Sequence, residues 1–181
     1  MATFQVQVED MVGTVGGDSS DTTALTSFLT DGAKDVINHM PLSLLRLCSS
    51  EVTFTPQAVG SEGSASTLNT AKIYNIRRSD GTIDQPCRLI RTSLKGRASD
   101  SDDMDYATAT DPVYYIESNF LNILPSSSSA VGKYSEVQYP AVAYGDSAIT
   151  LFPDELESLV VLYAAMKGIE RIITDTVGTD E

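Results

Sequence analysis

The stretch FPDELESLVVLYAAMKGIERII, residues 152–173, decides the fold because it predicts one long helix that is apolar on almost every side. Pro153 suits the first position of a helix, and Asp154 and Glu155 suit the positive end of the helix dipole. A helix that is apolar nearly all round needs burial nearly all round. Two explanations stay open: the helix is the centre of a compact core, or another chain covers part of it.

A second helix is predicted over residues 21–40. Asp21, Thr22 or Thr23 can cap its start, and Pro41 ends it because the residue before a proline is pushed out of the α region. Its apolar side chains recur on one face at Leu25, Phe28, Leu29, Ala33, Val36, Ile37 and Met40.

Shorter elements are predicted on either side of that helix. Residues 3–8 alternate between polar and apolar side chains, which is typical of a half-buried strand; an arm is the other reading that stays open. Gly13, Gly16 and Gly17 follow it and predict a flexible hinge. After Pro41, a short helix is expected over 42–47. It is expected to pack three side chains against the same core: Leu44, Leu45 and Leu47.

The middle of the chain predicts β structure. Asp80-Gly81 lies between two apolar runs at 71–77 and 86–91, which is a strong hairpin signal. Further strands are expected at 52–55, 113–117, 120–124 and 133–139. Short connections predict an antiparallel sheet, and strands between two helical regions give the α+β class.

Composition bounds the function. At 181 residues one domain is expected, with an arm and hinge at 1–20, a single α+β domain at 21–175 and an acidic tail at 176–181. The 12 Lys and Arg against 25 Asp and Glu give a net charge of −13, which disfavours tight binding to DNA. Two readings of this acidity stay open: a channel wall that lets DNA slide, with Asp100, Asp102, Asp103 and Asp105 as candidates, or simple solubility.

The chain lacks the apolar run of about 18 residues that a membrane span needs, and its first residues lack the pattern of a signal peptide. A soluble protein with no membrane partner is therefore expected. Without a secretory signal, Cys48 and Cys87 are expected to be reduced packing residues rather than a disulfide.

Catalytic, metal and cofactor sites are not expected. Gly145-Asp146-Ser147 resembles the start of a serine esterase family, but His39 is the single histidine and lies far upstream, so the serine lacks a base. The acidic residues at 100–105 do not follow the spacing of a calcium loop, and the cysteines and histidine do not follow that of a zinc site.

Six of the twelve cations lie within residues 77–97. On a hairpin, Arg77, Arg78, Arg88 and Arg91 would form one positive flank, together with Lys95 and Arg97. Two readings stay open: charged protection of a strand edge, or docking to an acidic partner or another copy of the chain.

The order of these segments resembles the head-to-tail adaptor, or neck, proteins of tailed bacteriophages. The resemblance covers most of residues 20–175. It is carried by the acidic, Gly-containing N-terminus, by DTTALTSFLTDGAKDVINHMP at 21–41, by PVYYIE at 112–117 and by FPDELESLVVLYAAMK at 152–167.

The resemblance implies a non-enzymatic virion subunit in the neck, made in the host cytoplasm. It implies a ring, commonly of twelve copies, that binds the portal protein and a tail or nozzle protein while DNA passes through its lumen. The implied fold packs the helices as a small bundle, with an antiparallel β insertion between the first and last helix. The residues it implies at a subunit or portal interface are Leu25, Phe28, Leu29, Leu156, Leu159, Val160 and Tyr163. The alternative is another virion component: a stopper, tail-tube or capsid-associated protein.

Overall fold

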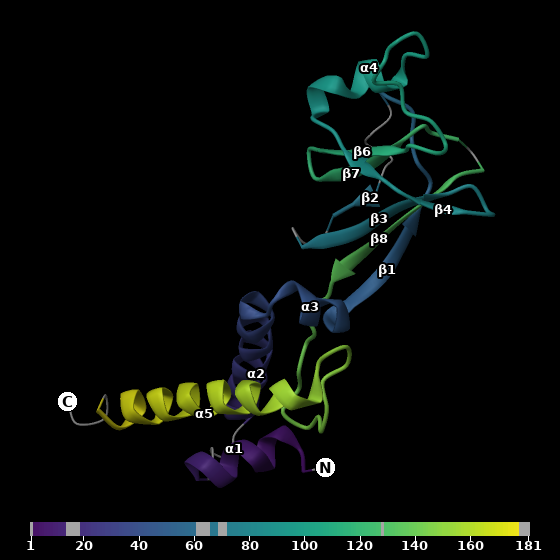
Figure 1. Cartoon of the computed structure of the whole chain (residues 1–181). Coiled ribbons are helices and arrows are strands. Elements are labelled where there is room, and N and C mark those ends of the chain that lie inside the picture. The colour runs from purple at the N-terminus through teal and green to yellow at the C-terminus, as the bar shows by residue number, and fades with distance from the viewer. Residues whose placement is uncertain (1, 14–18, 61–65, 69–71, 128, 178–181) are drawn as a thin grey trace. The chain divides into compact units, whose positions relative to one another are not determined.

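The computed structural model describes residues 2–13, 19–60, 66–68, 72–127 and 129–177 (Figure 1). The predicted hinge glycines Gly16 and Gly17, and residues 178–181 of the predicted tail, lie outside them. The class is α+β, as expected, with helices and two sheets. The chain divides into two compact units, a helical unit of Met1–Ser49 and Gln138–Glu181 and a β unit of Ser50–Val137.

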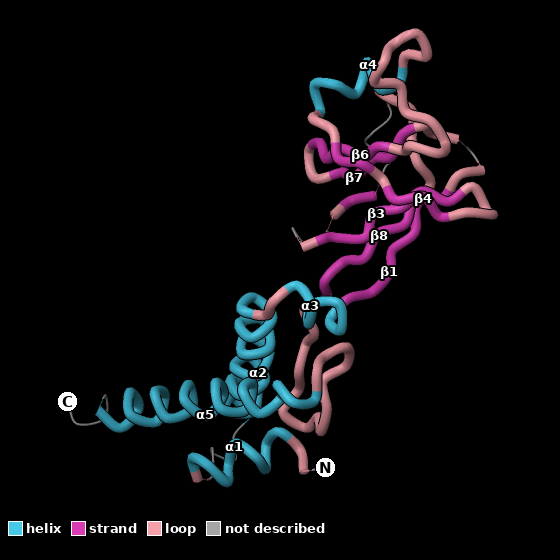
Figure 2. The backbone as a smooth tube through the Cα atoms, in the orientation of Figure 1, coloured by secondary structure: helices cyan, strands magenta, loops and turns pink. Residues whose placement is uncertain are grey.

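The helical unit is built around one long C-terminal helix. Its elements are α1 (Phe4–Val12), α2 (Ser19–His39), α3 (Leu42–Leu45), a 3₁₀ turn (Arg46–Cys48) and α5 (Asp154–Val177). Helix α5 contacts both α1 and α2 (Figures 1 and 2). The buried side chains of this unit include Phe4, Val8, Leu25, Leu29, Ala33, Ile37, Val160, Val161 and Ala164.

Helix α1 corrects the strand predicted over residues 3–8. Phe4 and Val8 are fully buried one helical turn apart, whereas Val6 between them is 43% exposed. The Thr3 side chain accepts a hydrogen bond from the Val6 amide and caps the helix. The Phe4 amide donates to the Asp146 carbonyl at 2.8 Å, so a distant loop satisfies a first-turn donor.

Helix α2 confirms the second predicted helix, although it begins at Ser19 and the proposed capping residues therefore lie inside its first turns. The helical piece expected at 42–47 is α3 followed by the 3₁₀ turn. Leu45 is buried as expected and Leu44 is half-buried. The prediction for Leu47 is wrong, because this side chain is 55% exposed.

The loop before α5 is fastened to α2 by threonine side chains. The Thr30 hydroxyl donates to the Val142 carbonyl at 3.2 Å and accepts from the Val142 amide at 3.1 Å. Glu157, buried in the first turns of α5, accepts a hydrogen bond from the Ile149 amide at 2.7 Å. These bonds hold the start of α5 against α2.

The described residues of the β unit form two four-stranded sheets. The first has the order β1 (Ser49–Phe54), β8 (Val131–Val137), β3 (Ile73–Ser79), β4 (Asp84–Pro86). The second has the order β2 (Ser66–Thr67), β7 (Phe120–Leu124), β6 (Val113–Glu117), β5 (Arg88–Leu89). Apolar side chains from both sheets form one core: Leu68, Ile76, Leu121, Ile123 and Tyr134. The short helices among the described residues of this unit are η3 (Thr92–Leu94) and α4 (Lys95–Ser99).

Both predicted hairpins are present. Strands β3 and β4 pair across Asp80-Gly81, and β6 and β7 pair across Ser118-Asn119. Ser118 and Asn119 have φ values of 49° and 67°, the left-handed conformation that a tight two-residue hairpin turn requires. The expectation of one antiparallel sheet is wrong in two respects: the described strands form two sheets, and β5 pairs with β6 in parallel.

Candidate interaction surface

One side of α5 is apolar and uncovered. Its exposed side chains Leu159, Leu162, Met166, Ile169 and Ile173, called here the α5 stripe, have between 44% and 57% of their surface accessible. Their spacing of three, four, three and four residues is that of the contact seam between paired helices. Within the described residues the chain itself leaves this side of α5 uncovered, so burial all round by the chain's own core is not observed. Coverage of this side by another chain stays a prediction.

The opposite side of α5 holds the helical unit together. Val160 and Ala164 are fully buried, and Val161 and Ala165 are nearly so. Close approach of α2 depends on Gly32, because a Cβ built there would lie 3.0 Å from Cδ1 of Tyr163. The two sides of α5 therefore have different roles: one packs the chain's own core and the other faces outward.

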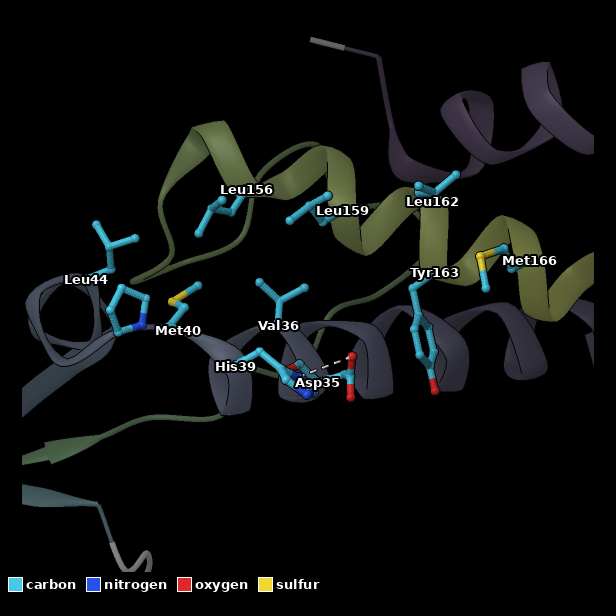
Figure 3. A pocket seen from close by; sticks show the side chains of 11 residues that line it. Asp35, Val36, His39, Met40, Leu44, Leu156, Leu159, Leu162, Tyr163 and Met166 are labelled. Atoms are coloured by element: carbon cyan, nitrogen blue, oxygen red, sulfur yellow. Dashed lines mark hydrogen bonds and ion pairs between the residues drawn. The ribbon is translucent and has the colours of Figure 1, made fainter.

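A groove of about 420 Å³ lies beside the first half of the α5 stripe (Figure 3). Val36 and Met40 point from α2 toward α5, and Tyr163 extends from α5 across α2 (Figure 3). The lining of the groove is almost entirely apolar. The residues that form it are Asp35, Val36, His39, Met40, Pro41, Leu44, Leu156, Leu159, Leu162, Tyr163 and Met166. This volume falls within the range of pockets that take apolar groups.

The polar rim of this groove is small. Nδ1 of His39 lies 2.9 Å from the Asp35 carbonyl oxygen and 3.7 Å from a carboxylate oxygen of Asp35. Both side chains are exposed, so this pair contributes little to stability. The groove therefore offers apolar contact with a small polar edge.

Charge is distributed unevenly along α5. Its first turns carry Asp154, Glu155 and Glu157, close to the residues that line the groove. Its two cations, Lys167 and Arg171, lie further along the helix. Lys167 pairs with Glu170 at 2.7 Å, and Arg171 pairs with Asp21 of α2 at 2.8 Å.

The residues expected at an interface divide into two groups. Leu156, Leu159 and Tyr163 line the groove, and Phe28 of α2 is half-buried. Three others are buried in the helical unit itself and are not available to a partner: Leu25, Leu29 and Val160. Helical periodicity locates an apolar face but does not show whether the chain or a partner covers it.

The residues of the predicted basic face do not all lie on one hairpin. Arg77 and Arg78 belong to β3, whereas Arg88 belongs to β5 in the other sheet, so these residues do not share a hairpin. Arg77 pairs with Glu51 and Asp84, and Arg88 pairs with Asp111 at 3.1 Å.

The remaining cations of this region are also largely engaged. Buried Arg78 donates from Nε to the Pro125 carbonyl at 2.9 Å, and Lys95 pairs with Glu117 at 2.6 Å. Arg91, just before η3, is exposed. Most of the positive charge in this region is therefore neutralised within the β unit.

The predicted acidic residues form a loop after α4. Arg97 pairs with Asp103 at 2.9 Å and with Asp105 at 3.1 Å. Asp100 accepts a hydrogen bond from the Asp102 amide at 3.1 Å. Ion pairing with Arg97 thus offsets part of the negative charge that this loop was expected to present.

Three further features bear on function: possible metal ligands, possible membrane spans and the state of the cysteines. Within the ranges that the structure describes, no three His, Cys, Asp or Glu side chains are grouped to hold a metal ion. The described helices include none that is both long and apolar enough to cross a membrane. Cys48 and Cys87 are free thiols, as expected.

Sequence reasoning missed much of the uncovered surface. It did not select Met40, Pro41 and Leu44, which line the groove near the end of α2. It also did not select Leu162, Met166, Ile169 or Ile173, although their seam-like spacing is visible in the sequence.

The chain matches no family model and no curated protein.

Proposed function

We propose that this protein is a structural virion subunit, without catalytic activity, that forms a ring between the portal and the tail of a tailed bacteriophage. The observation that carries this proposal is the uncovered α5 stripe. Solvent-exposed apolar patches of this kind mark surfaces that other protein covers. The resemblance of 21–41, 112–117 and 152–167 to neck proteins supplies the identity of the assembly.

The α5 stripe can offset part of the free-energy cost of assembly. Fully burying a large aliphatic side chain contributes roughly 1.5–3 kcal/mol relative to full exposure, and each of the five members leaves about half of its surface available. Association costs on the order of 4–15 kcal/mol in lost freedom of motion. Burial of the stripe alone therefore offsets only part of the association cost. A stable ring needs the groove or a portal surface as well.

In the proposed assembly, the helical unit is an adaptor-like bundle and the β unit is its insertion. The ring holds about twelve copies, contacts the portal on one side and a tail or nozzle protein on the other, and lets DNA pass without specific binding. The net charge of −13 per copy supports a channel with few sticking contacts for phosphate.

Cryo-electron microscopy of the native particle tests this proposal. The expected result is a ring of identical subunits in the neck, with density that fits the helical unit and the β unit. Density for this chain on the capsid surface, in a stopper or along the tail tube would show that the protein is another virion component and not an adaptor. Absence of the protein from purified particles would overturn both.

A further inference from the structure

We propose that Arg78 of β3 is a binding site for a single carboxylate group supplied by another molecule. Only 6% of the surface of Arg78 is accessible, and its Nε donates to the Pro125 carbonyl at 2.9 Å. Within the described residues its side chain makes no second hydrogen bond and no ion pair. Four of the five N–H donors of the guanidinium are therefore unused. This site does not depend on the proposed function.

The described part of the chain does not place a counter-ion beside Arg78. Its cross-strand neighbours are Gln85 on β4 and Gly132 on β8, and neither carries a charge. Asp80, two residues further along, accepts hydrogen bonds at 3.0 Å and 3.1 Å from backbone amides of its own turn. The carboxylate of Asp80 is therefore committed to the turn, and the guanidinium stays unpaired.

The neighbouring Arg77 has the opposite arrangement. It is less buried than Arg78, and it pairs with both Glu51 and Asp84. Arginine is rarely buried as deeply as Arg78 without a partner, because an unpaired charge away from water carries a large desolvation cost. A carboxylate bound at Arg78 offsets this cost.

The free donors of Arg78 are within reach of a ligand. Among the buried side-chain nitrogens and oxygens of the described residues, only Nε of Arg77 is sealed from solvent without a partner. The two terminal nitrogens of Arg78 have no partner, so they keep contact with solvent. The bond from Nε to the Pro125 carbonyl fixes the plane of the guanidinium and leaves its terminal edge open.

This chemistry favours a carboxylate over the phosphates of a nucleic acid. The terminal nitrogens of a guanidinium form a planar fork that matches the two oxygens of a carboxylate. Nucleic acid presents phosphates in a dense array, and its binding requires several accessible cations. One recessed cation in a chain of net charge −13 does not meet that requirement, whereas an isolated carboxylate needs only one fork.

Thermal unfolding of the full chain at pH 7 tests the site, with sodium acetate compared with sodium chloride at equal ionic strength. We expect acetate to raise the melting temperature of the parent by about 3–5 °C when its concentration is about ten times the dissociation constant. Arg78→Met is expected to lose this shift. Arg78→Lys is expected to keep at most about a third of it, because an ammonium group lacks the fork.

An acetylated peptide amide with one aspartate distinguishes the two sources of a carboxylate. A shift with both acetate and the peptide assigns the site to an acidic side chain of a protein, and a shift with acetate alone assigns it to a small carboxylic acid. A shift with inorganic phosphate but none with acetate would overturn the choice of a carboxylate.

Arg91→Met is the matched control, because Arg91 is exposed and its replacement removes the same charge from the surface. This variant is expected to keep the full acetate shift. Equal melting temperatures of the parent in acetate and chloride would overturn the site, whether or not Arg78→Met folds. Loss of the shift in Arg91→Met, or its retention in Arg78→Met, would do the same.

Discussion

At the scale of single residues, Leu159 and Val160 are adjacent on α5 but have opposite surroundings. Val160 is fully buried against the helical unit, whereas Leu159 lies in the α5 stripe. We predict that Val160→Asp costs several kcal/mol and lowers the melting temperature strongly, because it places an unpaired charge in the core. Leu159→Asp is predicted to change the unfolding free energy by about 0.5 kcal/mol or less and to weaken assembly.

Thermal unfolding followed by circular dichroism, together with sedimentation, checks this pair. Equal melting temperatures for the two variants would show that our assignment of the buried and exposed sides of α5 is wrong.

Asn122 is fully buried in β7, and its side chain is hydrogen-bonded to other parts of the β unit. Its side-chain amide donates to the Tyr115 hydroxyl at 2.9 Å and to the Gln57 carbonyl at 3.1 Å, and its oxygen accepts from the Gln57 amide at 3.1 Å. We predict that Asn122→Leu destabilises the protein by about 2–4 kcal/mol, because buried polar partners lose their hydrogen bonds. Tyr115→Phe, which removes one partner, should cost about 1 kcal/mol.

Urea denaturation measures both changes. A leucine variant as stable as the parent would mean that the hydrogen bonds of Asn122 contribute nothing to the fold.

At the scale of elements, the β3–β4 hairpin is tied to β8 by charge. Asp84 lies 3.1 Å from Nζ of Lys133 and 3.2 Å from Arg77. The hydrogen bond from Ser79, followed by that from Lys133, lowers the pKa of the Asp84 carboxyl in the folded protein. Its stabilising contribution is therefore complete above the ordinary carboxyl pKa of about 4 and is lost as the pH falls through the folded pKa.

We predict that Asp84→Asn is less stable than the parent at pH 7 and that the difference shrinks progressively below pH 4. Unfolding free energies measured from pH 7 to pH 2 check this. Parallel curves for parent and variant would contradict the assigned role of Asp84.

What the sequence can predict also depends on the element. The Asp80-Gly81 turn and the Ser118-Asn119 turn located both hairpins because turn chemistry is local. For α1, three apolar residues at positions 4, 6 and 8 fit a strand as well as a helix. The helix is selected by a distant loop at Tyr144 and Asp146, whose carbonyls accept hydrogen bonds from its first amides.

The sequence predicts part of the candidate surface, because some of its features are local and others depend on distant parts of the chain. The spacing of the α5 stripe is a sequence property, but its exposure depends on how α1 and α2 pack on the opposite side. The groove depends further on the close approach of α2 at Gly32. The pairing of β5 with β6 was not predictable from Arg88 and Leu89 alone, because two residues carry too little pattern.

At the scale of the whole molecule, the net charge of −13 predicts weak interaction with DNA. Phosphate binding requires accessible cations, and most of the cations at 77–97 are paired within the β unit. We expect no shift of duplex DNA in a gel at low salt and micromolar protein. Tight binding under these conditions would contradict a repulsive channel and point to the exposed Arg91 as a contact.

The central claim is that the outward side of α5 builds a multi-copy assembly on the portal. Mass photometry of the full chain mixed with purified portal protein measures this directly. We predict one complex whose mass corresponds to a portal ring with about twelve added copies for the parent and for Ser27→Asp, and far fewer added copies for Leu159→Asp and Ile173→Asp. A chain that stays monomeric and leaves the portal mass unchanged would contradict the claim.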